Sequence, residues 1–229
     1  MSNRKILVIA AHPDDEVIGC GGTIANHTNK GDEVNIIILA EGETSRRNNE
    51  GVGRTRKLLN LVEAANTASN ILGVKKLEML RYPDNRMDRF EQLQITKDIE
   101  NAIESCSPEI IYIHHSGDVN IDHRVIHQAA ITACRPQPGT CVKRVLSYEV
   151  ASSTEWQAPT SAPAFQPNWF VDIENTWDKK LKALQAYNME MKEWPHTRSI
   201  KAIKNLAMWR GSQVGVEMAE SFMLLREIR

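Results

Sequence analysis

The residues His12-Pro-Asp-Asp-Glu16 combine one imidazole with three carboxylates, and they follow directly on an apolar run over residues 6–11. Such a run predicts a buried strand, and open α/β sheets bind their ligands at the carboxyl ends of strands. His12 and Asp15 are three residues apart, so a turn can direct both toward one metal ion. Asp14 would then be available as a base. The alternative is a polar turn or a helix N-terminus, where acidic residues are common.

A second group of polar residues follows the apolar run over residues 110–113. It contains His114, His115, Asp118, Asp122, His123 and His127, so five of the seven histidines lie in the two groups. Parallel strands end on the same side of a sheet, so the two groups can meet there. Clusters of His and Asp are typical of metal or catalytic sites.

Three protein ligands and one open position are the pattern of catalytic zinc. Zinc lowers the pKa of bound water and polarises a carbonyl group, and a neighbouring carboxylate can accept the proton of the water. The chemistry expected of such a site is hydrolysis of an amide or an ester.

Several histidines of the second group have structural interpretations as well. His127 lies four residues after His123, where packing or support of a ligand is more common than ligation. His114 and His115 follow a strand, in which side chains alternate, so one is expected to face the sheet and the other the pocket. Either could be structural, and one of them could act in catalysis.

A dinucleotide site is the main competing interpretation. Gly19, Gly21 and Gly22 follow the first strand, and Glu41 ends the second strand, where a ribose-binding acid is expected. However, Ile24 stands at the position of the third glycine, and the acidic loop would repel a pyrophosphate. No cofactor other than a metal is therefore predicted, and the glycines are interpreted as tight turns behind the loop.

The elements that must position these residues follow from the hydrophobic pattern. Apolar, often β-branched runs predict strands over residues 6–11, 34–40, 77–80, 110–113, 144–150 and 169–173. Helical spacing predicts helices over residues 23–30, 54–72, 90–106, 122–134, 175–191 and 199–209. Alternating strands and helices predict an α/β fold: a three-layer, Rossmann-like arrangement with a mainly parallel sheet and helices on both faces.

No strong boundary divides the 229 residues, so a single domain over residues 1–229 is expected, in which the part after about residue 151 completes the pocket. The Ser-, Thr- and Pro-rich stretch over residues 152–167 contains Trp156 and Phe165, which favours an ordered irregular loop over a linker.

Bulk composition excludes several other classes. A net charge of −1 does not indicate a nucleic-acid-binding protein, and no apolar run is long enough to insert into a membrane. A signal peptide is also not recognisable, so the cytoplasm is the expected location. None of the four cysteines forms a CxxC pair, which argues against a structural zinc ribbon, and Cys20 is not favoured as a ligand.

The motifs resemble those of a known family. Ala11-His-Pro-Asp-Asp-Glu16 with its following glycines, Pro83-Asp-Asn-Arg86 and Asp118-Val-Asn-Ile-Asp-His123 are similar to stretches of the PIG-L/LmbE-like zinc N-deacetylases. The resemblance covers roughly the first 150 residues. It implies a divalent metal, usually zinc, and removal of an acetyl group from an amino sugar.

The resemblance also assigns roles to individual residues. It implies His12, Asp15 and His123 as metal ligands and Asp14 as the general base. Family members often carry a histidine where this chain has Asn120, and that histidine stabilises the oxyanion or protonates the leaving amine. Asn120 can donate a hydrogen bond but cannot act as a general acid. Either His115 or His196 replaces the missing acid, or Asp14 returns the proton.

Substrate contacts are implied by the same resemblance. Asp84 and Arg86 lie in a loop that contacts sugar in relatives, and Arg54 lies in a helix that often offers an arginine to the pocket. The alternative for each is a surface ion pair. The stretches 195–199 and 210–211 could also line the pocket.

The sequence therefore predicts a zinc-dependent hydrolase, with another divalent metal as an option, that removes an N-acyl group, most simply acetyl, from a small amino-sugar substrate. A homo-oligomer is a further expectation, since relatives are often multimeric. The alternatives are a non-catalytic sugar- or nucleotide-sugar-binding protein on the same fold, and an amidase or esterase that acts on a non-sugar substrate.

Overall fold

The structure is a computed structural model that describes residues 3–42, 52–158 and 162–229, without the side chains of residues 52–54. In this part of the chain, seven strands form one sheet in the order β3-β2-β1-β4-β5-β7-β6. Their bounds are β1 Lys5–Ala10, β2 Glu33–Ala40, β3 Lys76–Tyr82, β4 Ile110–His114, β5 Arg144–Tyr148, β6 Trp169–Asp172 and β7 Ala219–Glu227. Strands β1 to β5 pair in parallel, and β7 runs antiparallel to both of its neighbours.

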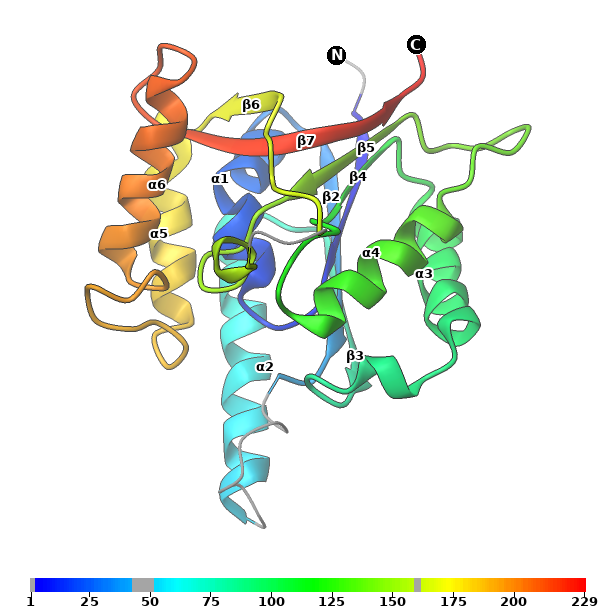
Figure 1. The fold of residues 1–229 in the computed structure, drawn as a ribbon, viewed down its shortest axis with the longest axis horizontal. Coiled ribbons are helices and arrows are strands. Elements are labelled where there is room, and N and C mark those ends of the chain that lie inside the picture. Colours follow the sequence, from blue (N-terminus) through cyan, green and yellow to red (C-terminus); the bar gives the residue numbers. More distant parts are fainter. Residues whose placement is uncertain (1–2, 43–51, 159–161) are drawn as a thin grey trace.

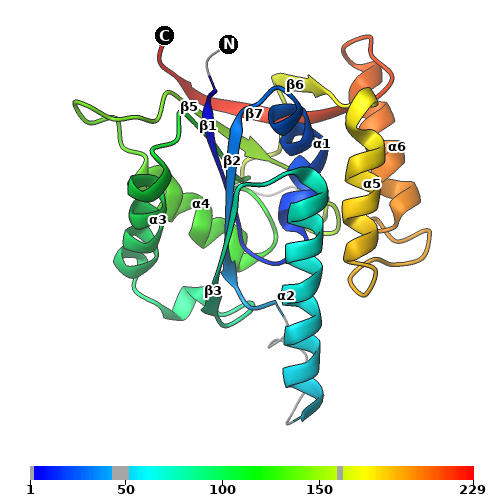
Figure 2. The ribbon, with the colours of Figure 1, turned by 180° about the vertical axis from the view of Figure 1, so that it is seen from behind.

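Helices cover both faces of the sheet, as Figures 1 and 2 show from opposite sides. One face carries α1 Asp15–Asn29, α2 Val52–Leu72, α5 Trp177–Ala186 and α6 Ile200–Ser212, and the other carries α3 Gln92–Cys106 and α4 Ile121–Ala133. Short 3₁₀ turns are η1 Met87–Arg89, η2 Thr154–Trp156 and η3 Glu174–Thr176.

Two hydrophobic cores result from the alternation of side chains along the strands. In β1, Ile6 and Val8 belong to the core under α1, and Leu7 and Ile9 belong to the core under α3 and α4. All four side chains are almost fully buried. The predicted three-layer, mainly parallel α/β fold is confirmed.

The predicted site residues collect where the order of the strands in the sheet reverses. After β1 the chain continues to β2 and β3 on one side, and β4 and β5 lie on the other side. The carboxyl ends of β1 and β4 are therefore neighbours at a topological switch point, which is where open α/β sheets bind ligands. No helix within the described ranges has the length and apolarity to cross a membrane.

Helix α1 corrects two expectations. It begins at Asp15 rather than near residue 23, and Gly19, Gly21 and Gly22 lie inside it rather than in turns. These glycines permit close packing: a Cβ at Gly19 would overlap the ring of Tyr148, and one at Gly22 would lie 2.6 Å from Ile173. Tertiary packing has overridden the low helix propensity of glycine here.

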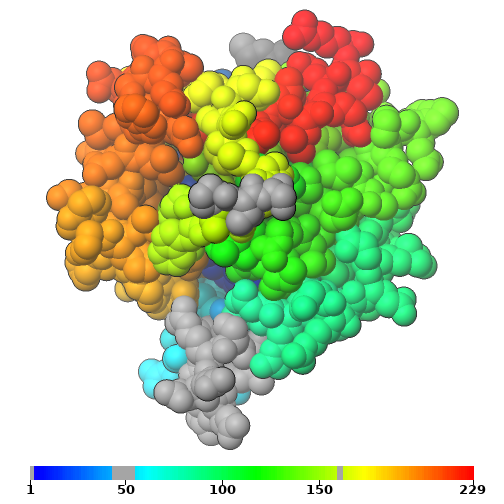
Figure 3. Space-filling model, in the orientation of Figure 1, coloured from blue at the N-terminus to red at the C-terminus, as the bar shows by residue number. Residues whose placement is uncertain are grey.

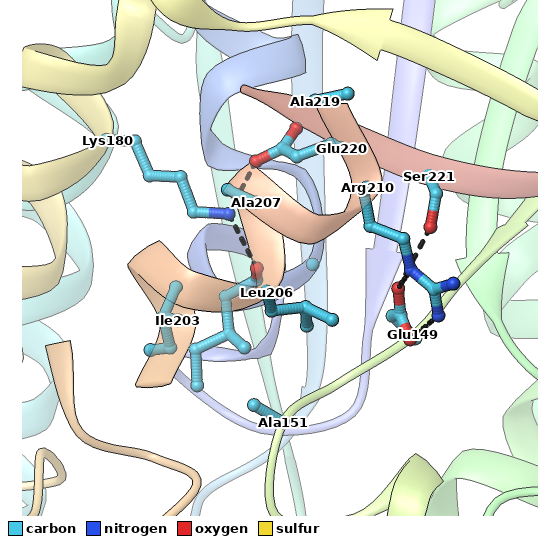
Figure 4. Close-up of a pocket in the computed structure, with 12 residues that line it drawn as sticks. Glu149, Ala151, Lys180, Ile203, Leu206, Ala207, Arg210, Ala219, Glu220 and Ser221 are labelled. Carbon is cyan, nitrogen blue, oxygen red and sulfur yellow. Dashed lines mark hydrogen bonds and ion pairs between the residues drawn. The ribbon is translucent and has the colours of Figure 1, made fainter. Parts of the chain in front are cut away.

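A buried ion pair forms hydrogen bonds with the backbone of α1 next to these glycines (Figure 4). Lys180 Nζ lies 2.6 Å from Glu220 Oε1 and donates a hydrogen bond to the carbonyl of Ile18 at 2.8 Å. The Glu220 carboxylate accepts the N–H groups of Gly22 at 2.8 Å and Thr23 at 2.7 Å. Both charged side chains are at most 5% exposed. Residues of α5 and β7 thus fix the helix whose first turn carries Asp15.

Candidate metal centre and catalytic pocket

Three of the predicted site residues converge at the switch point. His12 follows β1, Asp15 begins α1, and His123 lies in the first turn of α4. Each offers one ligand atom, and these atoms lie within 4.8 Å of one another. Asp15 Oδ2 is 3.2 Å from His12 Nδ1 and 3.2 Å from His123 Nε2. The chain therefore brings two imidazoles to one carboxylate, although they come from segments more than 100 residues apart.

The state of His123 fits a metal ligand. Its Nε2 is buried and has no hydrogen-bond partner among the described residues. Its other ring nitrogen, Nδ1, lies 3.1 Å from the Asp118 carboxylate. A histidine whose Nδ1–H is held by a carboxylate presents the lone pair of Nε2, which is the usual arrangement of a metal-binding histidine. A set of two His and one Asp suits zinc and other divalent metals.

Asp118 is itself held firmly. It accepts hydrogen bonds from the hydroxyl of Ser153, from Thr154 Oγ1 at 2.7 Å and from the N–H of Asn120 at 2.8 Å. Burial disfavours the charged carboxylate, but the charge of His123 and these hydrogen bonds outweigh it, so the pKa of Asp118 is below its usual range. Ser153 and Thr154 carry no recognisable signal in the sequence, because they lie 30 to 36 residues away from Asp118 and His123.

A second possible ligand group shares His12. His12 Nε2 lies 3.0 Å from Asp84 Oδ1 and 3.1 Å from Asp122 Oδ2. Both oxygens of Asp122 already accept backbone N–H groups, from Asn85 at 2.7 Å and from Met87 at 3.0 Å. Asp122 thus fixes the 83–88 loop, whereas His123 Nε2 has no hydrogen-bond partner among the described residues. The set with His123 is therefore the better candidate for a metal.

The charges of the cluster favour a cation at this point. Burial lowers the pKa of His123, but Asp15 and Asp118 outweigh it and raise that pKa to about 9. Burial likewise opposes the charge of His12, yet Asp122, Asp15 and Asp84 raise its pKa well above the usual value. A field that stabilises positive charge on the buried His123 and the half-buried His12 would also stabilise a bound divalent cation.

Asp14 stands apart from this cluster, although it is the neighbour of Asp15. Its backbone is left-handed, with φ +116°, and its N–H donates to Glu16 Oε2 at 3.1 Å. Its Oδ2 accepts a hydrogen bond from Arg198 Nη1 at 3.0 Å. Burial raises the pKa of Asp14 well above its usual value, although Arg198 acts in the opposite direction. Asp14 is thus a buried, oriented carboxyl group with an increased affinity for a proton.

A cavity of about 160 Å³ brings Asp14 and His12 together. Its lining is mostly polar and consists of His12, Pro13, Asp14, Gly42, Leu61, Asp84, Asn85, Asn120, Glu190 and Arg198. Figure 3 shows a small area of the blue N-terminal segment between the green and the gold surfaces. Arg198 belongs to the stretch 195–199, which the sequence predicts to line the pocket. Glu190 is not among the predicted residues.

The other predicted residues lie as follows. Asn120 lines the cavity and caps α4, since its Oδ1 accepts the N–H of Asp122 at 2.8 Å. Asp84 also lines the cavity. Arg86 is exposed and is not part of the lining. Arg54 lies in the first turn of α2, but its side chain is outside the described part.

The remaining histidines have partners elsewhere. His115 Nε2 lies 2.8 Å from the carbonyl of Pro163, and His115 is not part of the cavity lining. His196 Nδ1 accepts the N–H of Arg198 at 3.0 Å. His114 Nε2 accepts the N–H of Ala11 at 2.8 Å, and His127 Nδ1 donates to the carbonyl of His114. The contacts of His114 and His127 tie the strand ends to α4.

The chain is similar to several known proteins. A family model described as GlcNAc-PI de-N-acetylase, PIG-L, matches residues 7–134. A probable N-acetyl-alpha-D-glucosaminyl L-malate deacetylase 2 of Bacillus anthracis is 28% identical over 189 residues, 81% of this chain and 81% of that protein. A 4-oxalmesaconate hydratase of Pseudomonas putida is 25% identical over 224 residues, 90% of this chain and 83% of that protein.

A solved structure shows the same fold. The N,N'-diacetylchitobiose deacetylase from Pyrococcus horikoshii superposes with a TM-score of 0.79 at 22% identity, over 97% of this chain and 84% of that chain. The match extends well beyond the residues of the family model, since it covers nearly the whole chain.

Proposed function

The chain belongs to the PIG-L family of de-N-acetylases, and on that basis we propose that it is a metal-dependent hydrolase that removes an N-acetyl group from an amino sugar or sugar conjugate. The observation that carries this proposal is the buried Nε2 of His123, which forms no hydrogen bond within the described residues and lies 3.2 Å from Asp15 Oδ2, beside a cavity lined by His12 and Asp14. In this proposal His12, Asp15 and His123 hold zinc or another divalent metal.

Each residue has a defined part in the proposed reaction. The metal, when bound, would polarise the acetyl carbonyl and acidify a water molecule. Asp14 accepts the proton of that water, for which its raised pKa and its orientation by Arg198 are suited. Asn120 donates a hydrogen bond from its amide to the oxyanion.

The proton must then reach the leaving nitrogen. His115 and His196 are engaged by Pro163 and Arg198, which argues against either as the general acid. We therefore assign the return of the proton to Asp14, which releases the free amine. Arg198 and Glu190 line the cavity from the C-terminal part, so the proposal treats residues 1–229 as one functional domain.

The hydratase relative raises a second candidate function, the addition of water to an unsaturated acid. Of the described residues, the cavity lining includes the carboxylates Asp14, Asp84 and Glu190, and Arg198 is its one arginine or lysine. Arg198 is paired with Asp14. This charge balance disfavours a substrate with several carboxylates and favours a sugar.

The test is an assay of zinc-loaded protein against N-acetylglucosamine, N,N'-diacetylchitobiose, N-acetylglucosaminyl malate, a non-sugar amide and an ester, with acetate and free amine measured. We expect acetate and amine in equal amounts from at least one N-acetyl sugar. Asp14→Asn should keep its zinc and lose roughly 100-fold or more of the activity. Turnover of only the non-sugar compounds, or sugar binding without turnover, would contradict the proposal.

A further inference from the structure

Trp156 is a large aromatic side chain that the proposed mechanism does not use. It ends the 3₁₀ turn η2, and 53% of its surface is exposed. Single exposed apolar side chains are common on protein surfaces, so the position of Trp156 is more informative than its exposure. Glu155 and Gln157 on either side of it are polar, which is unlike an apolar protein-binding patch.

Ring and hydrogen-bond contacts connect Trp156 through His196 to Arg198, which lines the cavity. Its ring centroid is 5.5 Å from that of His196, in an edge-to-face arrangement. His196 accepts the N–H of Arg198, and Arg198 donates to Asp14 at 3.0 Å. In Figure 3 the yellow-green segment around residue 155 borders the gold and orange segments of the C-terminal part. His196 thus lies between Trp156 and Arg198 of the cavity lining.

The turn that carries Trp156 is held to the proposed machinery at two points. Ser152 Oγ accepts a hydrogen bond from Arg198 Nε at 2.9 Å, which ties the turn to the partner of Asp14. The hydroxyl of Ser153 donates to Asp118, which holds His123. The indole is therefore presented by a fixed backbone next to the pocket, and binding of a ligand to it costs little ordering entropy.

Trp194 is exposed to the same extent but is differently placed. The ammonium group of Lys201 lies 4.7 Å from the centroid of its ring, so one face already has a partner. Trp156 has only the edge-on contact with His196 among the aromatic and cation contacts of the described residues. Trp156 is therefore the better platform for a ligand ring.

The cavity itself is small for a whole glycoconjugate. Its volume of about 160 Å³ is below the roughly 300–1,000 Å³ that is usual for sites that enclose a drug-sized ligand. The deacetylases named above act on a glucosaminyl malate and on diacetylchitobiose, in which the N-acetylated sugar carries a second group. Such a group would extend over the rim.

We propose that Trp156 is a stacking platform for a second sugar ring, so that the substrate class is an N-acetylated disaccharide or longer oligosaccharide rather than a free monosaccharide. This inference rests on the proposed function. The C–H groups on one face of a pyranose ring are apolar and can cover the indole, while its hydroxyl groups stay in water or reach polar neighbours such as Gln157.

The test compares Trp156→Ala and Trp156→Phe with the wild type on N-acetylglucosamine and N,N'-diacetylchitobiose. Loss of the platform should raise KM for the disaccharide roughly 10-fold, as expected when about 50 Å² of apolar contact is lost. Turnover of the monosaccharide should not change, and Trp156→Phe should retain most of the affinity. Trp209→Ala is the matched control, since Trp209 is 61% exposed and lies in the last turn of α6, at the end of the helix away from Arg198. Equal losses on both substrates, or no loss on either, would overturn the proposal.

A binding measurement separates this proposal from the proposed function. Calorimetric titration of N,N'-diacetylchitobiose into Asp14→Asn and into the Asp14→Asn/Trp156→Ala double variant does not require turnover. Weaker binding by the double variant supports the platform even if the wild type is inactive, in which case only the proposed deacetylation fails. Equal binding by the two variants overturns the platform.

Discussion

Two groups of buried charged side chains lie along the first half of α1, and they differ in how fully their polar atoms are paired. Around the glycines, Lys180 and Glu220 bind each other and three backbone groups of the helix. At the N-terminus of the helix, the imidazoles of His12 and His123 both approach Oδ2 of Asp15. His123 Nε2 has no hydrogen-bond partner among the described residues.

The difference separates structural charge from functional charge. A buried ion pair whose hydrogen bonds are satisfied holds elements in place, whereas an unpaired buried polar atom is costly unless something else binds it. We therefore expect changes in the Lys180–Glu220 pair to affect stability and changes in the His/Asp cluster to affect metal binding.

The largest effect is expected for Lys180→Met. This change leaves the Glu220 carboxylate buried without its cation and should lower the free energy of unfolding by about 3–5 kcal/mol. Urea denaturation of the metal-free protein measures it. The double variant Lys180→Met/Glu220→Gln removes the unpaired charge and should recover part of the loss. Zinc affinity of the folded single variant should be unchanged. A large loss of zinc affinity at equal folded fraction would show that the Lys180–Glu220 pair is not purely structural.

An intermediate effect is expected for Asp118→Asn, on the other side of the comparison. The amide of this variant can no longer accept the Nδ1–H of His123 with the strength of a carboxylate, so zinc affinity should fall about 10- to 100-fold. Competition with a chromophoric chelator measures this affinity. The unfolding free energy of the metal-free variant should fall by less than in Lys180→Met. An unchanged zinc affinity would show that Asp118 does not support a ligand.

The smallest effect is expected for Tyr187→Phe. Tyr187 Oη donates to Glu16 Oε1 at 2.6 Å, and Glu16 holds the N–H of Asp14. Loss of one hydrogen bond should lower the unfolding free energy by about 1 kcal/mol. If Glu16 positions Asp14 through this contact, kcat should also fall several-fold while zinc affinity stays the same. A fall in zinc affinity instead would place Tyr187 with the metal cluster.

The layers of the fold and the two loops at the switch point are predictable from the sequence, because both depend on local patterns. Buried parallel strands are continuous apolar runs, and the polar residues that follow β1 and β4 are visible directly. The predicted helix is shorter than α1 because three glycines are poor helix formers. Their place in the helix depends on Tyr148, Ile173 and Lys180, which are distant in sequence.

Distant contacts also explain what the sequence does not indicate. No strand is predicted where β7 lies, although β7 inserts between β5 and β6. Glu190 and the support of Asp118 by Ser153 come from the C-terminal half, and no spacing rule connects them with His12 or His123. The catalytic and metal roles of His12, Asp14, Asp15, Asn120 and His123 stay predictions, as do the sugar contacts of Arg54, Asp84 and Arg86.

The most direct test of the account is the zinc content of the purified wild type and of His123→Ala after saturation with zinc and removal of the excess. Elemental mass spectrometry should find about one zinc per chain in the wild type and almost none in the variant, because a catalytic zinc site relies on three protein ligands. Equal zinc content in the two proteins, or a wild type that is active without any metal, would contradict the claim that Nε2 of His123 completes a metal centre.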